Sequence, residues 1–184
     1  YYPGGNNMAY ANYLEAMTYY VLIKKPNYSQ TNSYEALNRF KFILNAYPNS
    51  NYEIDILIKI KILQNNLAAN KLNIAKFYMN KKNYNAALLY LMDNIENHSS
   101  SNSIQETLYH ITKIYKYLEE IDLSKKYAAI LAYNFPDSDW YEKSFNLIND
   151  LEIKKNKKNW FDSYNPVKII LKDITEDVEI QKID

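Results

Sequence analysis

The sequence predicts an all-α protein, a tetratricopeptide-like α-solenoid of antiparallel helix pairs. A connector of the form aromatic, Pro, any residue, small residue recurs along the chain, most clearly at 47–50 and 135–138. Between the connectors, apolar residues recur at intervals of three and four, and no useful stretch before residue 160 alternates with period two. Helical hairpins that repeat in this way bury their apolar stripes by stacking on one another.

Each connector is interpreted as a turn between two helices. The aromatic residue packs at a helix end, Pro disfavours helix in the residue before it, and the small residue begins the next helix. Ser50 with Glu53, Ser103 with Glu106, and Asn32 with Glu35 have the spacing of capping boxes, which mark helix starts. The copies of the connector are Tyr2-Pro3-Gly4-Gly5, Tyr47-Pro48-Asn49-Ser50, Phe135-Pro136-Asp137-Ser138 and a degenerate His98-Ser99-Ser100-Ser101.

The first four helices follow in order from these starts and stripes. A helix over 7–24 carries tyrosines at helical spacing, and a second over 32–46 follows the Asn32 start. The third is expected to be one long helix near 51–80, because neither Pro nor Gly interrupts this stretch. The fourth, over 84–97, repeats the apolar stripe of the second helix 51 residues later.

Three further helices complete the repeats, over 103–119, 123–134 and 138–152. The resulting organisation is a helical repeat domain over 1–152 and a charged C-terminal tail over 153–184. The tail is expected to be extended or partly disordered, either docked on the solenoid as an arm or without fixed structure.

Composition excludes several classes of protein. The chain has no cysteine, which excludes disulfides, thiolate metal sites and Cys nucleophiles among these residues. Its two glycines, Gly4 and Gly5, cannot supply the glycine-rich loops that bind nucleotide phosphates in Walker and Rossmann sites. A net charge of +1 disfavours a nucleic-acid partner, although the lysines between 154 and 158 leave nucleic acid or anionic lipid open as a weaker alternative to a solvated helix end.

No catalytic constellation is apparent. His98 lies beside three serines in a turn, where adjacent residues cannot form a nucleophile, base and orienting group. His110 has Glu106 four residues before it, which is typical of a pair on a helix surface. We therefore expect no enzyme activity, metal or cofactor.

Aromatic residues remain as the main signal for binding. The first helix is apolar nearly all round, and such a helix is either buried on two faces or lines a groove. It therefore either packs against an upstream repeat or forms a ligand groove. Trp140 and Tyr141 form a second candidate surface, with core packing as the competing explanation. The stripe of the first helix consists of Tyr10, Tyr13, Met17 and Tyr20.

Several stretches of the sequence resemble known protein families. Helix pairs that end in Tyr-Pro-x-Ser resemble tetratricopeptide-type repeats, with Lys81-Lys82-Asn83 and Glu119-Glu120 where the turn glycine usually stands. More specifically, residues 1–145 resemble the BamD family of outer-membrane assembly lipoproteins. The matching stretches are Ala9-Tyr10-Ala11-Asn12-Tyr13-Leu14 with Tyr19-Tyr20; Glu35-Ala36-Leu37 through Phe40 to Tyr47-Pro48-Asn49-Ser50-Asn51-Tyr52; Leu67-Ala68 through Ala75-Lys76-Phe77-Tyr78 with Tyr84-Asn85-Ala86-Ala87; and Ala132-Tyr133-Asn134-Phe135-Pro136-Asp137-Ser138.

This resemblance implies a non-catalytic scaffold at the periplasmic face of the outer membrane. It implies as partners the barrel-forming outer-membrane assembly protein, other assembly lipoproteins and unfolded β-barrel substrates, with no nucleic acid. It also implies that the membrane is reached only through an N-terminal lipid anchor; the signal, anchor cysteine and first repeat of the family are absent from these residues. The repeats from about 84 to 145 are expected to hold the assembly partner, and the first helices to receive substrate. Besides the tyrosine stripe, the candidate partner-binding residues are Gln105, Tyr109, Asn134, Asp139 and Trp140.

One feature departs from the family, since Gln105 stands where some members place a basic residue. The alternative function is a generic tetratricopeptide-repeat scaffold of another cell-envelope or cytoplasmic complex. An enzyme or nucleic-acid binder is the third class, which a pocket with converging ionisable groups or steeply salt-dependent RNA binding would indicate.

Overall fold

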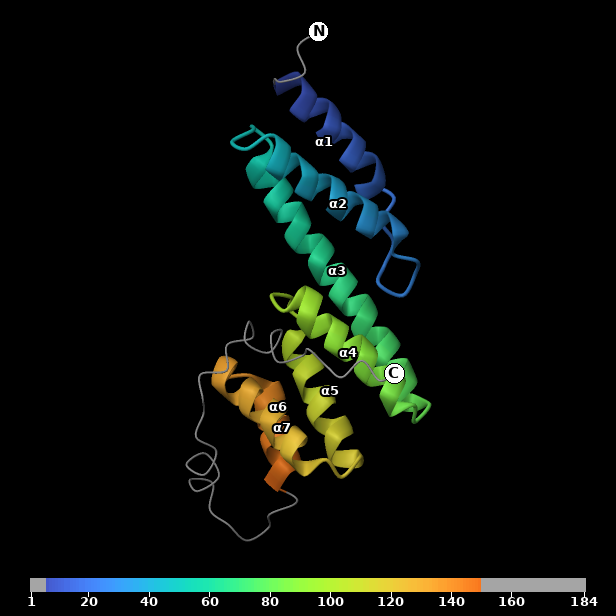
Figure 1. Cartoon of the computed structure of the whole chain (residues 1–184), viewed down its shortest axis with the longest axis vertical. Helices are drawn as coiled ribbons and strands as arrows, with labels where there is room; N and C mark the ends of the chain where they lie inside the picture. The colour runs from blue at the N-terminus through green and yellow to red at the C-terminus, as the bar shows by residue number, and fades with distance from the viewer. Residues whose placement is uncertain (1–5, 150–184) are drawn as a thin grey trace, which may run out of the picture. The chain divides into compact units, whose positions relative to one another are not determined.

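The computed structural model describes residues 6–149, and within this range the protein contains seven helices and no strand (Figure 1). The predicted all-α class is therefore confirmed, as is the long third helix. The helices are α1 (Asn6–Tyr20), α2 (Thr31–Ala46), α3 (Glu53–Asn80), α4 (Tyr84–His98), α5 (Ile104–Tyr117), α6 (Ile121–Asn134) and α7 (Asp139–Asn149).

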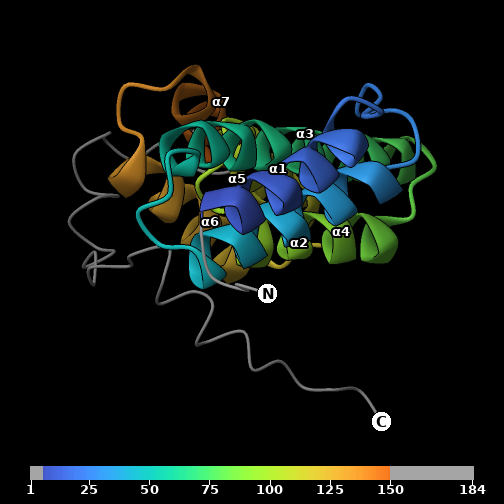
Figure 2. The same cartoon turned by 90° about the horizontal axis from the view of Figure 1, so that it is seen from above.

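The chain divides into two compact units, Tyr1–Asn73 and Ile74–Asp184, which we call unit 1 and unit 2. The division falls within α3. In unit 1, α1 packs beside α2, and Figures 1 and 2 both show the two helices side by side. In unit 2, α5 packs against α4, α6 and α7, and α6 also contacts α7.

The core of unit 1 lies where α1, α2 and α3 meet. The apolar stripe of α2 supplies most of it, because residues three and four apart share one helix face. Phe40 is fully buried, and its ring centroid lies 6.2 Å from that of Tyr13 and 6.0 Å from that of Tyr20. The buried members are Ala16, Ala36, Leu37, Phe40, Ile43, Ile56, Leu63 and Leu67.

In unit 2, α5 packs against three other helices. Its inward face combines apolar residues with two buried threonines, Thr107 and Thr112. A smaller cluster joins α6 to α7 through Ala128 and Ile148, with Phe145 packed against them. The buried residues of α5 are Ile104, Thr107, Leu108, Ile111, Thr112 and Ile114.

The aromatic-Pro connectors form the turns that the sequence predicts. Tyr47 and Phe135 end α2 and α6 with nearly equal dihedral angles, φ −134° and ψ 64° against φ −141° and ψ 58°. Both residues lie outside the α-helical region, which a following Pro disfavours, and each still donates its N–H to the carbonyl four residues back. Ser138 then caps α7, because its Oγ accepts a hydrogen bond from the Tyr141 N–H at 3.1 Å.

Two turns without glycine adopt the left-handed conformation that glycine usually occupies. Lys82 has φ 57° and Glu119 has φ 63°. The following residues, Asn83 and Glu120, donate to the carbonyls of Tyr78 and Tyr115, five residues back, which is the bond that defines a Schellman helix end. Lys82 and Glu119 thus occupy turn positions where tetratricopeptide-type repeats usually have glycine, and their backbone conformation is one that glycine adopts without strain.

Two kinds of sequence-based prediction are wrong, one helix end and the three capping boxes. The first helix ends at Tyr20 rather than at 24, and the capping boxes do not form. The Glu53 carboxylate accepts from the Asn49 N–H at 3.0 Å instead, and Ser103 makes no side-chain cap. Asn32 lies inside α2 and donates to the Leu22 carbonyl.

The Glu53 and Asn32 side chains thus bond to partners outside the expected boxes. The connector Tyr2-Pro3-Gly4-Gly5, the last residues of the expected helix 138–152, the domain boundary at 152 and the tail over 153–184 lie outside the described residues.

Candidate partner-binding surfaces

The predicted residues Tyr109 and Trp140 lie together on the surface formed by α5 and α7. Their ring centroids are 5.2 Å apart with an interplanar angle of 40°, and both residues are half-buried. Lys143, one turn after Trp140 on α7, places its Nζ 4.0 Å from the centroid of the indole ring. We call Tyr109, Trp140 and Lys143 the α5–α7 aromatic surface; it combines aromatic rings, which are enriched at protein interfaces, with a cation over one ring.

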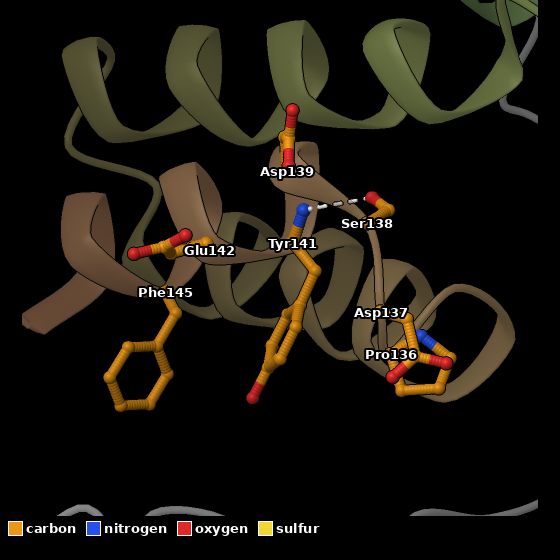
Figure 3. Close-up of a pocket in the computed structure, with 7 residues that line it drawn as sticks. All are labelled: Pro136, Asp137, Ser138, Asp139, Tyr141, Glu142 and Phe145. Atoms are coloured by element: carbon orange, nitrogen blue, oxygen red, sulfur yellow. Dashed lines mark hydrogen bonds between the residues drawn. The ribbon is translucent and has the colours of Figure 1, made fainter.

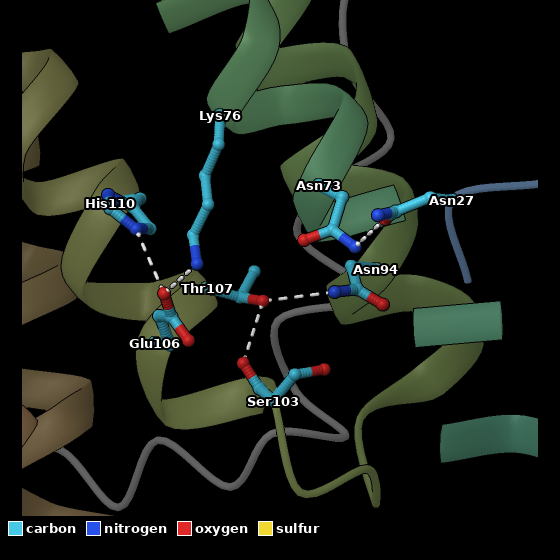
Figure 4. Close-up of polar contacts among 8 residues, drawn as sticks. All are labelled: Asn27, Asn73, Lys76, Asn94, Ser103, Glu106, Thr107 and His110. Atoms are coloured by element: carbon cyan, nitrogen blue, oxygen red, sulfur yellow. Dashed lines mark hydrogen bonds and ion pairs between the residues drawn. The ribbon is translucent and has the colours of Figure 1, made fainter. Parts of the chain in front are cut away.

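A charged cluster lies beside these rings. Figure 4 shows the side chains of Lys76 and His110 both reaching the carboxylate of Glu106, as an ion pair from Lys76 and a 3.4 Å contact from His110 Nε2. His110 also lies against Trp140, with ring centroids 6.2 Å apart. Burial lowers the pKa of His110 and outweighs the raising effect of Glu106, so the imidazole is neutral near pH 7.

The other predicted partner-binding residues of unit 2 do not form a single cluster with the α5–α7 aromatic surface. Asn134 donates its side-chain amide to the Ile130 carbonyl of its own helix at 2.9 Å. Gln105 is half-buried one turn before Tyr109. Asp139 is exposed in the first turn of α7, where a carboxylate is favoured by the helix dipole.

Asp139 also lines a pocket of about 430 Å³ at the start of α7. Figure 3 shows the rings of Tyr141 and Phe145 pointing to the same side of the helix, with a centroid separation of 6.1 Å. Since Asp139 and Glu142 occupy the first turn of α7, the helix dipole accounts for these two carboxylates. The lining residues are Pro136, Asp137, Ser138, Asp139, Tyr141, Glu142 and Phe145.

In unit 1, the tyrosine stripe of α1 mostly packs inward. Tyr13, Met17 and Tyr20 are partly buried against the core. Tyr10 is 48% exposed and stacks on Tyr52 with centroids 5.7 Å apart, and Tyr52 in turn stacks on Tyr13 at 4.7 Å. The stripe is therefore core along most of its length, and Tyr10 is the member that offers a ring to solvent.

A polar group fixes the position of Tyr13. Its hydroxyl donates to Asp55 Oδ2 at 2.6 Å, and Lys59 Nζ lies 2.5 Å from Asp55 Oδ1. The hydrogen bonds from Lys59 and Tyr13 lower the pKa of Asp55, while burial and Asp55 itself raise the pKa of Tyr13. The carboxylate thus remains charged and anchors the aromatic stack.

Sequence reasoning missed two groups of residues. Lys143 could have been found, because a lysine three residues after a tryptophan on one helix lies on the same face. The asparagines Asn66, Asn70 and Asn73 of α3 are the second group, and each donates a hydrogen bond to the loop between α1 and α2. Their spacing of four and three places them on one helix face, which is the signal that was available.

Among residues 6–149, no group of three or more His, Asp or Glu side chains is placed to hold a metal ion. Within the same part of the chain, none of the helices is both long enough and apolar enough to cross a membrane.

Comparison with known proteins identifies relatives over most of the chain. It is 33% identical over 151 residues to the outer membrane protein assembly factor BamD of Rickettsia prowazekii, covering 82% of this chain and 60% of that protein. It is 30% identical over 149 residues to BamD of Caulobacter vibrioides, covering 81% of this chain and 49% of the relative. BamD of Buchnera aphidicola is 27% identical over 144 residues, with coverages of 73% and 58%.

The chain thus spans between about half and three-fifths of the length of these curated relatives. Residues 1–131 match the YfiO family, described as an outer membrane lipoprotein, and this match covers well over half of the chain. The expected resemblance is confirmed: the chain belongs to the YfiO/BamD family of outer membrane lipoproteins.

Proposed function

We propose that the protein is a non-catalytic scaffold of outer-membrane β-barrel assembly, working at the periplasmic face of the outer membrane. In this role it holds the periplasmic domains of the barrel-forming assembly protein, together with other assembly lipoproteins. Family membership supports the process, since the relatives are named outer membrane protein assembly factors.

The observation that carries the proposal is the α5–α7 aromatic surface. Tyr109 supports one side of the Trp140 ring, and Lys143 covers the ring with its ammonium group. These contacts hold the indole in place before any partner arrives, so little side-chain entropy is lost on binding. Half-buried Trp and Tyr side chains in a packed setting are typical of the few residues that dominate the energy of an interface.

The backbone beneath this surface is also well fixed. Lys116 Nζ donates to the carbonyl of Leu147 at 2.6 Å, which ties the C-terminal part of α7 to α5. The Ser138 cap fixes the other end of α7. A surface on two braced helices presents its side chains more precisely than a surface on loops.

Binding to the purified periplasmic domains of the barrel-forming assembly protein tests the proposal. Trp140→Ala should weaken the affinity of the complete chain by about tenfold or more, and Tyr109→Ala should have a similar effect. Tyr133→Ala is the matched control, because Tyr133 is an exposed aromatic residue of α6 in the same unit, and it should leave affinity unchanged. Wild-type affinity of the Trp140 variant would reject this surface, and no binding by the wild-type chain would reject the scaffold role itself.

The same scaffold is proposed to receive extended segments of unfolded β-barrel substrates through unit 1. Tyr10 supports this second role, since its ring is 48% exposed and stacked on Tyr52. Tyr10→Ala should weaken binding of an extended peptide from an outer-membrane barrel protein, whereas Tyr34→Ala, at 41% exposure on α2, should not. Equal loss in both variants, or in neither, would contradict this role.

A further inference from the structure

The loop 21–30 between α1 and α2 exposes large apolar side chains. Val21 is 69% exposed, and Leu22 and Tyr28 are each 59% exposed. Figure 1 draws this loop extending beyond the ends of the two helices that it joins. The loop thus exposes three large apolar or aromatic side chains within eight residues.

The carbonyl groups of this loop are held mainly by side-chain amides. Five of its carbonyls each accept a hydrogen bond from an Asn or Gln side chain, and Asn73 binds the Asn27 side chain at 2.8 Å (Figure 4). The bonds to carbonyls run from Asn32 to Leu22 (3.2 Å), from Asn66 to Lys24 (3.4 Å), from Gln30 to Lys25 (3.2 Å) and Tyr28 (2.9 Å), and from Asn70 to Pro26.

A tight turn at the tip adds to this restraint. The Tyr28 N–H donates to the Lys25 carbonyl at 3.0 Å, which closes a β-turn with Pro26 at its second position. The loop is therefore shaped in advance, and its exposed side chains bind without a large cost in ordering the backbone.

The charged residues within the loop are both lysines. Lys24 and Lys25 are both exposed, and the sequence contains no acidic residue between Glu15 and Glu35. The helix that holds the loop is similar, since no Asp or Glu occurs between Asp55 and Asp93. The complementary surface is therefore anionic.

We infer that the loop 21–30 binds an anionic lipid surface. Val21, Leu22 and Tyr28 enter the boundary between headgroups and acyl chains, while Lys24 and Lys25 lie at the headgroup phosphates. Exposed apolar and aromatic side chains next to lysines on a protruding loop suit a bilayer interface, which accepts all three chemistries at once. A soluble anion or a nucleic-acid backbone would leave the apolar side chains without a partner.

A label at one position tests this directly. Because the chain contains no cysteine, Leu22→Cys places a polarity-sensitive fluorophore at a single known site in the complete protein. Vesicles containing phosphatidylglycerol should shift its emission to the blue, and vesicles of phosphatidylcholine alone should not. Leu89→Cys is the matched control, since Leu89 is 73% exposed on α4 and should show no shift. The label also distinguishes binding by the loop from binding by the lysines at 154–158, because it reports the surroundings of residue 22 alone.

Unlabelled variants then measure the parts played by charge and shape. Lys24→Gln and Lys25→Gln should each weaken vesicle affinity about fivefold. Asn70→Ala should also weaken it, because it releases the Pro26 carbonyl and loosens the loop. No blue shift at residue 22, or undiminished affinity in the double lysine variant, would overturn the inference. A shift produced by an acidic peptide but not by vesicles would overturn it in favour of a protein partner.

Discussion

Asn94 of α4 donates its side-chain amide to Thr107 Oγ1 of α5 at 3.0 Å, and both residues are fully buried (Figure 4). Thr107→Val keeps the shape of the side chain but removes the acceptor, which leaves a polar group of Asn94 poorly satisfied in the core. We expect the free energy of unfolding to fall by about 1–3 kcal/mol, measured by urea denaturation.

The paired variant distinguishes the hydrogen bond from packing. Asn94→Leu with Thr107→Val removes both polar groups, and its cost should be smaller than the sum of the single variants. Strict additivity of the two single changes would show that the bond between them contributes nothing.

Left-handed residues at two helix ends offer a route to higher stability. Lys82→Gly and Glu119→Gly remove the steric penalty of a Cβ at φ 57° and φ 63°, and each should raise the free energy of unfolding by about 1 kcal/mol. Lys41→Gly serves as the control of opposite sign, because Lys41 lies inside α2 and the change should destabilise by about 1 kcal/mol. Destabilisation by all three changes would contradict the assigned turn geometry.

Phe40 and Phe42 form a natural pair for testing the core of unit 1. Phe40 is fully buried and Phe42 is 54% exposed, although they lie on the same helix. Phe40→Ala should lower the free energy of unfolding by about 3–5 kcal/mol, and Phe42→Ala by about 1 kcal/mol or less. Thermal or chemical unfolding followed by circular dichroism checks the ranking, and similar losses would place the core elsewhere.

Acidification should destabilise the protein through His110. Burial lowers the folded-state pKa of this residue, so below about pH 6.5 the unfolded chain binds a proton that the folded chain does not. The free energy of unfolding therefore falls as pH falls through this window, by at most about 1.4 kcal/mol per pH unit from this one group.

The His110→Gln variant isolates this contribution. Urea unfolding from about pH 7.5 to about pH 5.5 should show a flatter pH dependence in the variant than in the wild-type protein. A steeper dependence in the variant would mean that the folded state raises the pKa of His110 instead.

The sequence predicted the order and type of every described helix, because apolar periodicity and the Tyr47 and Phe135 connectors are local signals. Both connectors restrict the residue before Pro, and this restriction does not depend on the rest of the fold. Helix starts were less predictable. Two expected capping boxes do not form: Glu106 makes an ion pair with Lys76 instead, and Glu53 accepts a hydrogen bond from the Asn49 N–H.

The candidate surfaces were only partly predictable, for a related reason. Helical spacing predicted the tyrosine stripe of α1, but not that Tyr13 and Tyr20 would pack against Phe40 while Tyr10 stays exposed. Likewise, the asparagines at positions 66, 70 and 73 of α3 carry no hydrophobic signal. Its partners are backbone carbonyls about 40 residues away, which only the folded chain brings near.

The most direct test of the scaffold role is photo-crosslinking in native membranes. A photoreactive amino acid at Lys143, which covers the Trp140 ring, should give a covalent adduct that mass spectrometry identifies as the barrel-forming assembly protein. The same residue at Phe42, exposed on α2, should give no such adduct. An adduct from position 42 and none from position 143 would contradict the account.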